Sequence, residues 1–148
     1  MKNPETIFLM ALVPEFSCDG GLLLEYFVVY IVGALGYGSL EFLYRGYTHW
    51  TMLITGGLCF TALYAIANSS MILVFQCVLG AVVITTIELL SGMIVNLWLG
   101  WDVWDYSSQP FNLNGQICLS FSLIWFALCC PAAYICRGMR KRFARRWS

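Results

Sequence analysis

Charged residues are scarce in this chain of 148 residues. They make up 11% of it, with 8 basic side chains against 8 acidic ones, whereas 60% of the residues are hydrophobic. Soluble domains carry roughly 25% charged residues, so this composition argues against a water-soluble domain. The even balance of charge argues against a nucleic-acid partner, which requires a basic surface. Intrinsic disorder is excluded because it needs few apolar residues and many charges.

Several chemical signatures are also missing. The only two lysines, Lys2 and Lys141, lack the glycine-rich loop of a Walker A motif. The seven cysteines include no C-x-x-C pair, and there is a single histidine. The patterns H-E-x-x-H, G-x-S-x-G and S-x-x-K do not occur. We therefore assign no catalytic residue, no metal ligand and no cofactor, and a protein other than an enzyme is favoured.

Long apolar runs, in contrast, cover most of the chain. About 20 helical residues cross the hydrocarbon core of a bilayer. Four runs reach about this length, at residues 22–44, 50–67, 71–96 and 116–136, and the polar link at 68–70 makes the middle two an antiparallel hairpin. We expect an all-α, integral membrane four-helix bundle that forms a single transmembrane domain over residues 1–148. A short apolar segment at 7–13 is expected to lie in the membrane interface.

The basic residues predict the orientation. Six of the eight lie in the C-terminal tail at 137–148, and Lys2 lies at the other end. Because the number of spans is even, both termini lie on one side, and the positive-inside rule makes that side cytoplasmic. The chain is then a multi-pass protein of the cell membrane whose tail contacts anionic lipid. Docking of the tail on a protein partner is the alternative.

Polar residues of all four spans are predicted to reach one membrane depth. Glu88 lies seventeen residues after Met71, which is roughly 26 Å along a path of about 30 Å. Glu41 lies at a similar depth in the first span. Further polar residues follow at steps of four, which share a helix face if the helix continues. They are Arg45 and His49 after Glu41, Asn96 after Glu88 and Gly92, and Gln116 with Ser120 at the fourth span.

This polar cluster has two interpretations. In the structural one, Glu41 pairs with Arg45 or His49, and Glu88 accepts hydrogen bonds from Thr or Trp donors. In the functional one, the cluster lines a cavity near the outer face that binds a polar solute or carries protons. The candidate substrate-binding or pore-lining residues are Glu41, Arg45, His49, Glu88, Asn96, Asp105, Tyr106, Asn112 and Gln116.

The loop before the fourth span contributes three of these candidates. Its aromatic residues at 98–106 fit an interfacial belt. The residues at 110–115 read as an ordered turn, and Asp105 or Asn112 is a candidate cap for the fourth helix. We expect this loop to fold back over the polar cluster.

Several of these motifs resemble a known family. They are the stretches 41–52 and 56–60, the series Glu88, Gly92 and Asn96, and the run W-D-Y-S…P-x-N…G-x-I-C-L at 104–119. Together they resemble bacterial membrane proteins grouped as ABC-transporter type IV permeases. The resemblance implies an α-helical, multi-pass protein of the bacterial inner membrane. It also implies an ATPase subunit in trans.

Three functions remain open at this stage. The first is a transporter or permease component, with membrane lipid around it and a homo-oligomer supplying the pathway. The second is an intramembrane enzyme that acts on lipid or envelope material. The third is a non-catalytic membrane subunit whose polar cluster is structural.

Overall fold

The computed structural model describes residues 20–147, and most of them are helical. The helices are α2 (Gly20–Arg45), α3 (Trp50–Ala67), α4 (Leu73–Gly92) with its π-helical continuation η1 (Met93–Trp98), and α5 (Leu119–Trp147). All four segments are long and apolar enough to cross a membrane. The prediction of an all-α protein with four membrane-spanning helices is therefore confirmed. The predicted interfacial segment at 7–13 lies outside the described residues.

The fourth helix departs most from its predicted bounds. Residues 116–136 were expected to be helical, but α5 begins at Leu119 and continues through the basic tail to Trp147. Before it, the short strand β2 (Ile117–Cys118) pairs with β1 (Asn112–Leu113), with Leu113 opposite Ile117. The first turn expected of the helix is thus the second arm of a small hairpin.

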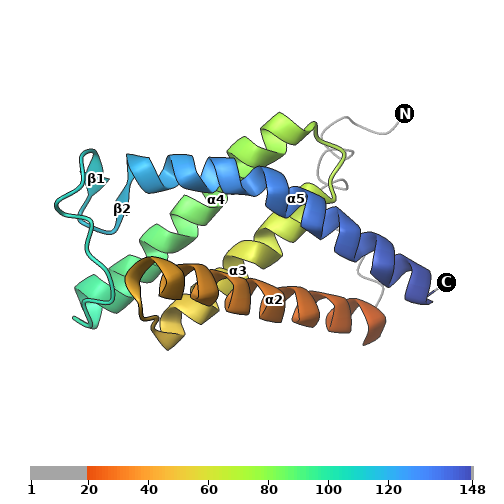
Figure 1. Ribbon diagram of the computed structural model, residues 1–148, viewed down its shortest axis with the longest axis horizontal. Coiled ribbons are helices and arrows are strands. Elements are labelled where there is room, and N and C mark those ends of the chain that lie inside the picture. Colours follow the sequence, from red (N-terminus) through yellow and green to blue (C-terminus); the bar gives the residue numbers. More distant parts are fainter. Residues whose placement is uncertain (1–19, 148) are drawn as a thin grey trace, which may run out of the picture.

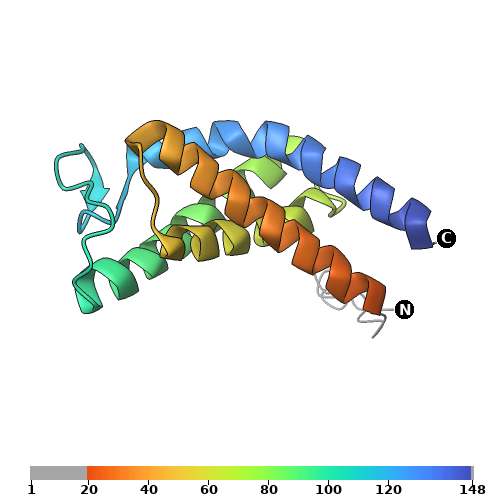
Figure 2. The same ribbon diagram turned by 60° about the horizontal axis from the view of Figure 1, so that its bottom comes forward.

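The helices are arranged around α3. Helix α3 packs against α2, α4 and α5, and α4 packs against α5, whereas α2 and α5 come close at few points. Figure 1 shows α2 and α5 along two edges of the bundle with α3 and α4 crossing between them. One end, here called the loop end, holds the hairpin, and the other, the basic end, holds the start of α2 and the end of α5, as Figure 2 also shows.

Small residues allow α2 and α3 to approach closely. A Cβ atom added at Gly33 would lie 2.9 Å from the carbonyl oxygen of Gly56, and one added at Gly56 would overlap Tyr37. Without an apolar driving force between helices in lipid, such close contact supplies the packing energy. Large apolar side chains such as Leu35, Leu43 and Phe75 are exposed on the outside of the bundle, as expected where lipid surrounds it.

Candidate functional site

The predicted site residues fall into separate hydrogen-bonded clusters at or near the loop end. The first joins Glu41 to Arg45 in an ion pair one turn along α2. The Thr48 hydroxyl donates to Glu41 at 2.5 Å, and Arg45 donates to the carbonyl oxygen of Val103 at 2.7 Å. The pairing of Glu41 with Arg45 therefore agrees with the structural interpretation, and it ties α2 to the long loop.

His49 does not share a helix face with Glu41. Helix α2 ends at Arg45 because Gly46 adopts a left-handed conformation, with φ +78°. His49 is instead the N-cap of α3, where the Thr51 N–H donates to its Nδ1 at 3.4 Å and the Thr51 hydroxyl lies 2.8 Å from the same nitrogen. Its position satisfies a helix end, as expected of an Ncap residue.

The second cluster is centred on Asn96 in η1. The Asn96 side chain is buried, donates to the carbonyl oxygen of Trp104 at 2.9 Å and to Gln116 at 2.8 Å, and accepts from the Val103 N–H at 2.8 Å. Trp104 in turn donates from its indole nitrogen to the carbonyl oxygen of Gln116 at 2.9 Å. Asn96 and Gln116, which were predicted to be at one depth, do meet, and they bind the loop between η1 and α5.

The remaining predicted residues order this loop. Asp105 accepts from the Ser107 N–H at 2.8 Å and from the Ser107 hydroxyl at 2.5 Å, and these bonds lower the pKa of Asp105. Asn112 accepts from the Gly115 N–H at 3.1 Å. Neither residue caps α5, which was one expectation, because both side chains are used in turns before the helix begins at Leu119.

Tyr106 lies at the boundary between the loop and α5. Its ring stacks on Phe121, with centroids 4.6 Å apart, and burial raises the pKa of the Tyr106 phenol.

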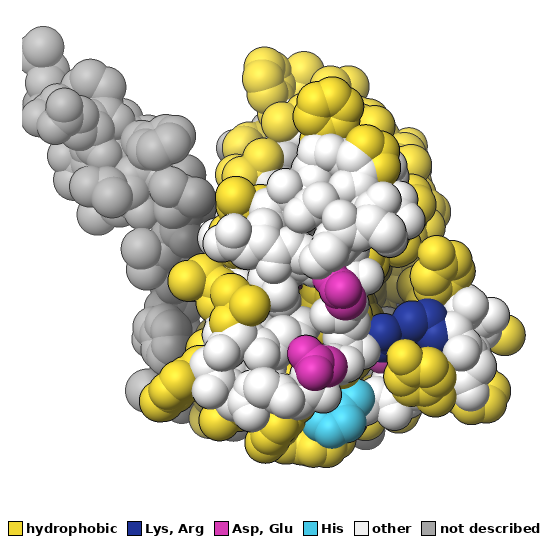
Figure 3. All heavy atoms as spheres, turned by 90° about the vertical axis from the view of Figure 1, so that its left-hand side faces the viewer, with side chains coloured by type: hydrophobic (Ala, Val, Ile, Leu, Met, Phe, Trp, Pro, Cys, Tyr) yellow, Lys and Arg dark blue, Asp and Glu magenta, His cyan; other side chains and the backbone are white. Residues whose placement is uncertain are grey.

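Figure 3 shows the loop end, where acidic side chains, the histidine and a basic side chain lie near one another and apolar side chains surround them.

The third cluster contains Glu88, which is buried in α4. Tyr37 of α2 donates to one oxygen of Glu88 at 2.6 Å, and the Trp125 indole of α5 donates to the other at 2.7 Å. The two rings stack with centroids 5.4 Å apart. A tryptophan donor was expected in general terms, but Tyr37 was missed, because nothing in the sequence indicates which residues of α2 and α5 face α4.

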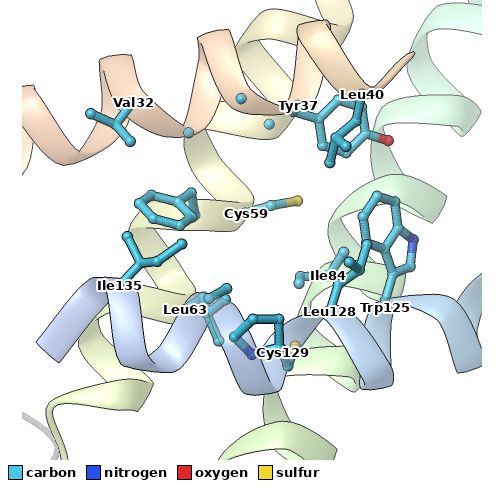
Figure 4. A pocket seen from close by; sticks show the side chains of 16 residues that line it. Val32, Tyr37, Leu40, Cys59, Leu63, Ile84, Trp125, Leu128, Cys129 and Ile135 are labelled. Atoms are coloured by element: carbon cyan, nitrogen blue, oxygen red, sulfur yellow. The ribbon is translucent and has the colours of Figure 1, made fainter. Parts of the chain in front are cut away.

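Next to this cluster lies a cavity that is lined almost entirely by apolar groups. It has a volume of about 410 Å³ and lies between α2 and α5, with α3 behind it; its lining includes Val32, Tyr37, Phe60, Trp125, Leu128 and Ile135. Figure 4 shows the polar atoms of Tyr37 and Trp125 on the same side, away from the middle of the cavity. Leu40, Leu128 and Ile135 on its lining are exposed, so the cavity is a groove open at the surface of the bundle.

The nine predicted residues thus do not surround one open polar cavity. Within residues 20–147, every buried side-chain nitrogen or oxygen atom has a hydrogen-bond partner. In that same part of the chain, no group of three or more His, Cys, Asp or Glu is placed to hold a metal ion. The polar residues satisfy one another, and the open space beside them is apolar.

A polar layer at the basic end was not predicted. Glu25 is buried and accepts hydrogen bonds from Tyr64 and, at 2.8 Å, from Arg140. Arg137 donates to the Gln76 side chain at 2.6 Å and to the carbonyl oxygen of Ala67 at 3.1 Å. Two arginines assigned to a lipid-contacting tail therefore join α5 to the other three helices. A signal was present in Glu25, an acidic residue inside an apolar run.

The four long apolar helices define a multi-pass α-helical membrane protein. Residues 20–148 match the family described as "Putative ABC-transporter type IV", and the chain belongs to this family. The resemblance noted in the sequence is therefore confirmed. No curated protein matches the chain, and no solved structure does.

Proposed function

We propose that this chain is the membrane-embedded component of a transporter and that Glu88 is its proton-binding site. One observation carries the proposal. Of the glutamates in the described helices, Glu25 and Glu41 each have an arginine partner, whereas Glu88 has only the neutral donors Tyr37 and Trp125.

The surroundings of Glu88 suit a group that takes up and releases a proton. An unpaired carboxylate away from water is costly, and this cost favours the protonated form. The hydrogen bonds from Tyr37 and Trp125 favour the charged form instead. These influences act in opposite directions, so that a change in either aromatic partner would shift the balance between the protonated and the charged form.

A proton site is better supported than a site for a polar solute. A solute would have to displace the hydrogen bonds that Glu41, Arg45, Asn96 and Gln116 make with their present partners. A proton needs no such space. The enzyme alternative receives little support, because His49, Glu88 and Asp105 each have separate hydrogen-bond partners.

The orientation and the partners are part of the same proposal. The arginines of the basic end support a cytoplasmic position for both termini under the positive-inside rule, and Glu88 would then lie in the outer half of the bilayer. The description of the family supports an ATPase in trans as the energy source. The connection between α3 and α4 is short, because it consists of residues 68–72 alone. The end of α5 therefore offers a longer surface for such a subunit. A homo-oligomer would enlarge the pathway.

A hydrophobic carbodiimide tests the role of Glu88. Such reagents react with protonated carboxyl groups within the bilayer, and mass spectrometry of the digested protein locates the adduct. We expect label on Glu88, decreasing as the pH rises, and little on the ion-paired Glu25 and Glu41 of the same molecules. Glu88→Gln should lose the label while keeping its helical circular dichroism spectrum. Equal labelling of all three glutamates, or none on Glu88, would overturn the proposal.

A further inference from the structure

The groove between α2 and α5 has the size of a small-molecule site. Its volume of about 410 Å³ falls within the range of about 300–1,000 Å³ typical of ligand pockets. Its exposed rim residues, such as Leu40 and Ile135, lie on the part of the bundle that faces lipid. A ligand would therefore reach it from the membrane and must itself be lipophilic.

A glutamate side chain lies directly behind the lining of the groove. Glu88 lies behind Tyr37 and Trp125, which form part of the lining, and no arginine or lysine lines the groove. The phenol and indole donors are both directed to Glu88. The groove thus presents aromatic rings with a carboxylate behind them and offers no charged donor that could bind an anion.

Aromatic rings backed by a carboxylate recognise cations. A cation over the face of Trp or Tyr, within about 6 Å of the ring centroid, is attracted by the ring quadrupole. Hydrogen-bond donation from both rings to a carboxylate moves electron density into the rings, because linked hydrogen bonds polarise one another. Glu88 therefore strengthens the attraction even though Tyr37 and Trp125 lie between it and the groove.

We propose that this groove binds a lipophilic organic monocation, with its charge against Tyr37 and Trp125 and its apolar body along α2 and α5. Charge complementarity selects this occupant. A lipid acyl chain would fill the same apolar space but would make no use of an unpaired carboxylate. The inference rests on the proposed function, since it assigns a ligand to the same carboxyl: cation and proton compete for Glu88, so that binding of one releases the other.

The first measurement uses tetraphenylphosphonium as the cation and triphenylphosphine oxide as a neutral compound of similar shape. Binding to the full chain in lipid nanodiscs is followed by equilibrium dialysis. We expect saturable binding of the phosphonium that is stronger at high pH than at low pH. Binding to Glu88→Gln should be at least about tenfold weaker, a loss that corresponds to one charge interaction of about 1.4 kcal/mol. Asp102→Asn also removes one negative charge, but in the exposed loop, and should bind as the wild type does.

A pair of glycine variants locates the binding site without altering Glu88. Gly36 lines the groove, and a Cβ atom there meets no atom within 4 Å, so Gly36→Leu should fill the groove without displacing the helices. Gly138 on α5 is equally free of neighbours and is not part of the lining. We expect Gly36→Leu to abolish phosphonium binding and Gly138→Leu to keep it. This comparison holds even if Glu88→Gln does not fold.

Three outcomes would overturn the inference: equal binding of the neutral compound, unchanged binding in Glu88→Gln, or unchanged binding in Gly36→Leu. Equal binding of the neutral compound would identify the groove as a general apolar site, as for a lipid chain. If the phosphonium fails to bind while Glu88 keeps its pH-dependent carbodiimide label, only the ligand assignment fails. Loss of both results would remove the proposed function as well.

Discussion

Glu88 and Asn96 lie eight residues apart on one continuous helical segment, and both are buried, yet their surroundings differ. Asn96 is bound by backbone groups of the loop and by the Gln116 amide. Glu88 is bound by two aromatic side chains that belong to other helices and line a groove. One cluster fastens a loop, and the other adjoins open space. Glu88 thus differs from Asn96 in being an acidic group whose two partners are both neutral.

The comparison predicts the largest loss of stability at Asn96. Asn96→Ala removes three hydrogen bonds and leaves the Val103 N–H and the Gln116 oxygen without their partner. We expect the free energy of unfolding to decrease by about 3 kcal/mol, because each unsatisfied buried group costs about 1–3 kcal/mol. Unfolding by sodium dodecyl sulfate in mixed micelles measures this change.

A matched control for this variant is Asn68→Ala. Asn68 is exposed, and its side chain donates only to the carbonyl oxygen of Tyr64 at the end of α3. Water or lipid headgroups can replace that bond, so the loss should be below about 1 kcal/mol. Equal effects of the two variants would show that the hydrogen bonds of Asn96 do not stabilise the loop, and Asn96 would then not differ from Glu88 in this respect.

Tyr37→Phe should have a smaller effect on stability and a specific effect on Glu88. It removes one donor at 2.6 Å and keeps the ring that stacks on Trp125. We expect a loss of about 1.5–2 kcal/mol, the lower end of the range for a hydrogen bond to a charged group. We also expect more carbodiimide label at a given pH, since the charged form loses a donor. Tyr44→Phe, an exposed change on the same helix, is the control. Unchanged labelling in Tyr37→Phe would separate Tyr37 from the proton site.

The presence of the apolar helices and the pairing of residues within one helix could be predicted from the sequence, because both depend on neighbouring residues. Helix α3 has the predicted bounds of 50–67, and the Glu41–Arg45 pair follows from the step of four. The partners of Glu88 could not be predicted, because Tyr37 and Trp125 are 51 and 37 residues away. Their contact depends on how α2 and α5 rotate about their axes, which packing decides.

The extension of α5 shows the same limit at the basic end. A cluster of basic residues at the end of a helix is typical of a solvated tail. Arg137 nevertheless donates hydrogen bonds to Ala67 and Gln76, and Arg140 donates one to Glu25, so that they contact three other helices. Charge counting predicted the side of the membrane and missed these bonds. The proposal of a cytoplasmic end is compatible with both roles, because four other basic residues remain in the tail at 137–148.

The ion pair of Glu25 and Arg140 should contribute less than either buried cluster. Half of the Arg140 side chain is exposed, and ion pairs that reach water contribute about 0–1 kcal/mol. A double-mutant cycle with Glu25→Gln and Arg140→Gln should give a coupling energy below about 1 kcal/mol in mixed micelles. A much larger coupling would mean that the basic end is as tightly held as the Asn96 cluster.

The smallest effect is expected at Asp105, in the turn of the loop that the Asn96 cluster fastens. The Ser107 hydroxyl and N–H lower the pKa of this exposed carboxyl, so its contribution is present above the unfolded pKa of about 3.9 and is lost as the pH falls through the folded value. Ser107→Ala should raise the pKa of Asp105, as measured by NMR titration of the labelled carboxyl, and Ser108→Ala should leave it unchanged. If Ser107→Ala has no effect, the Ser107 hydroxyl does not hold the turn, and the other hydrogen bonds of the loop, such as those of Asn112 and Asn96, are sufficient for its order.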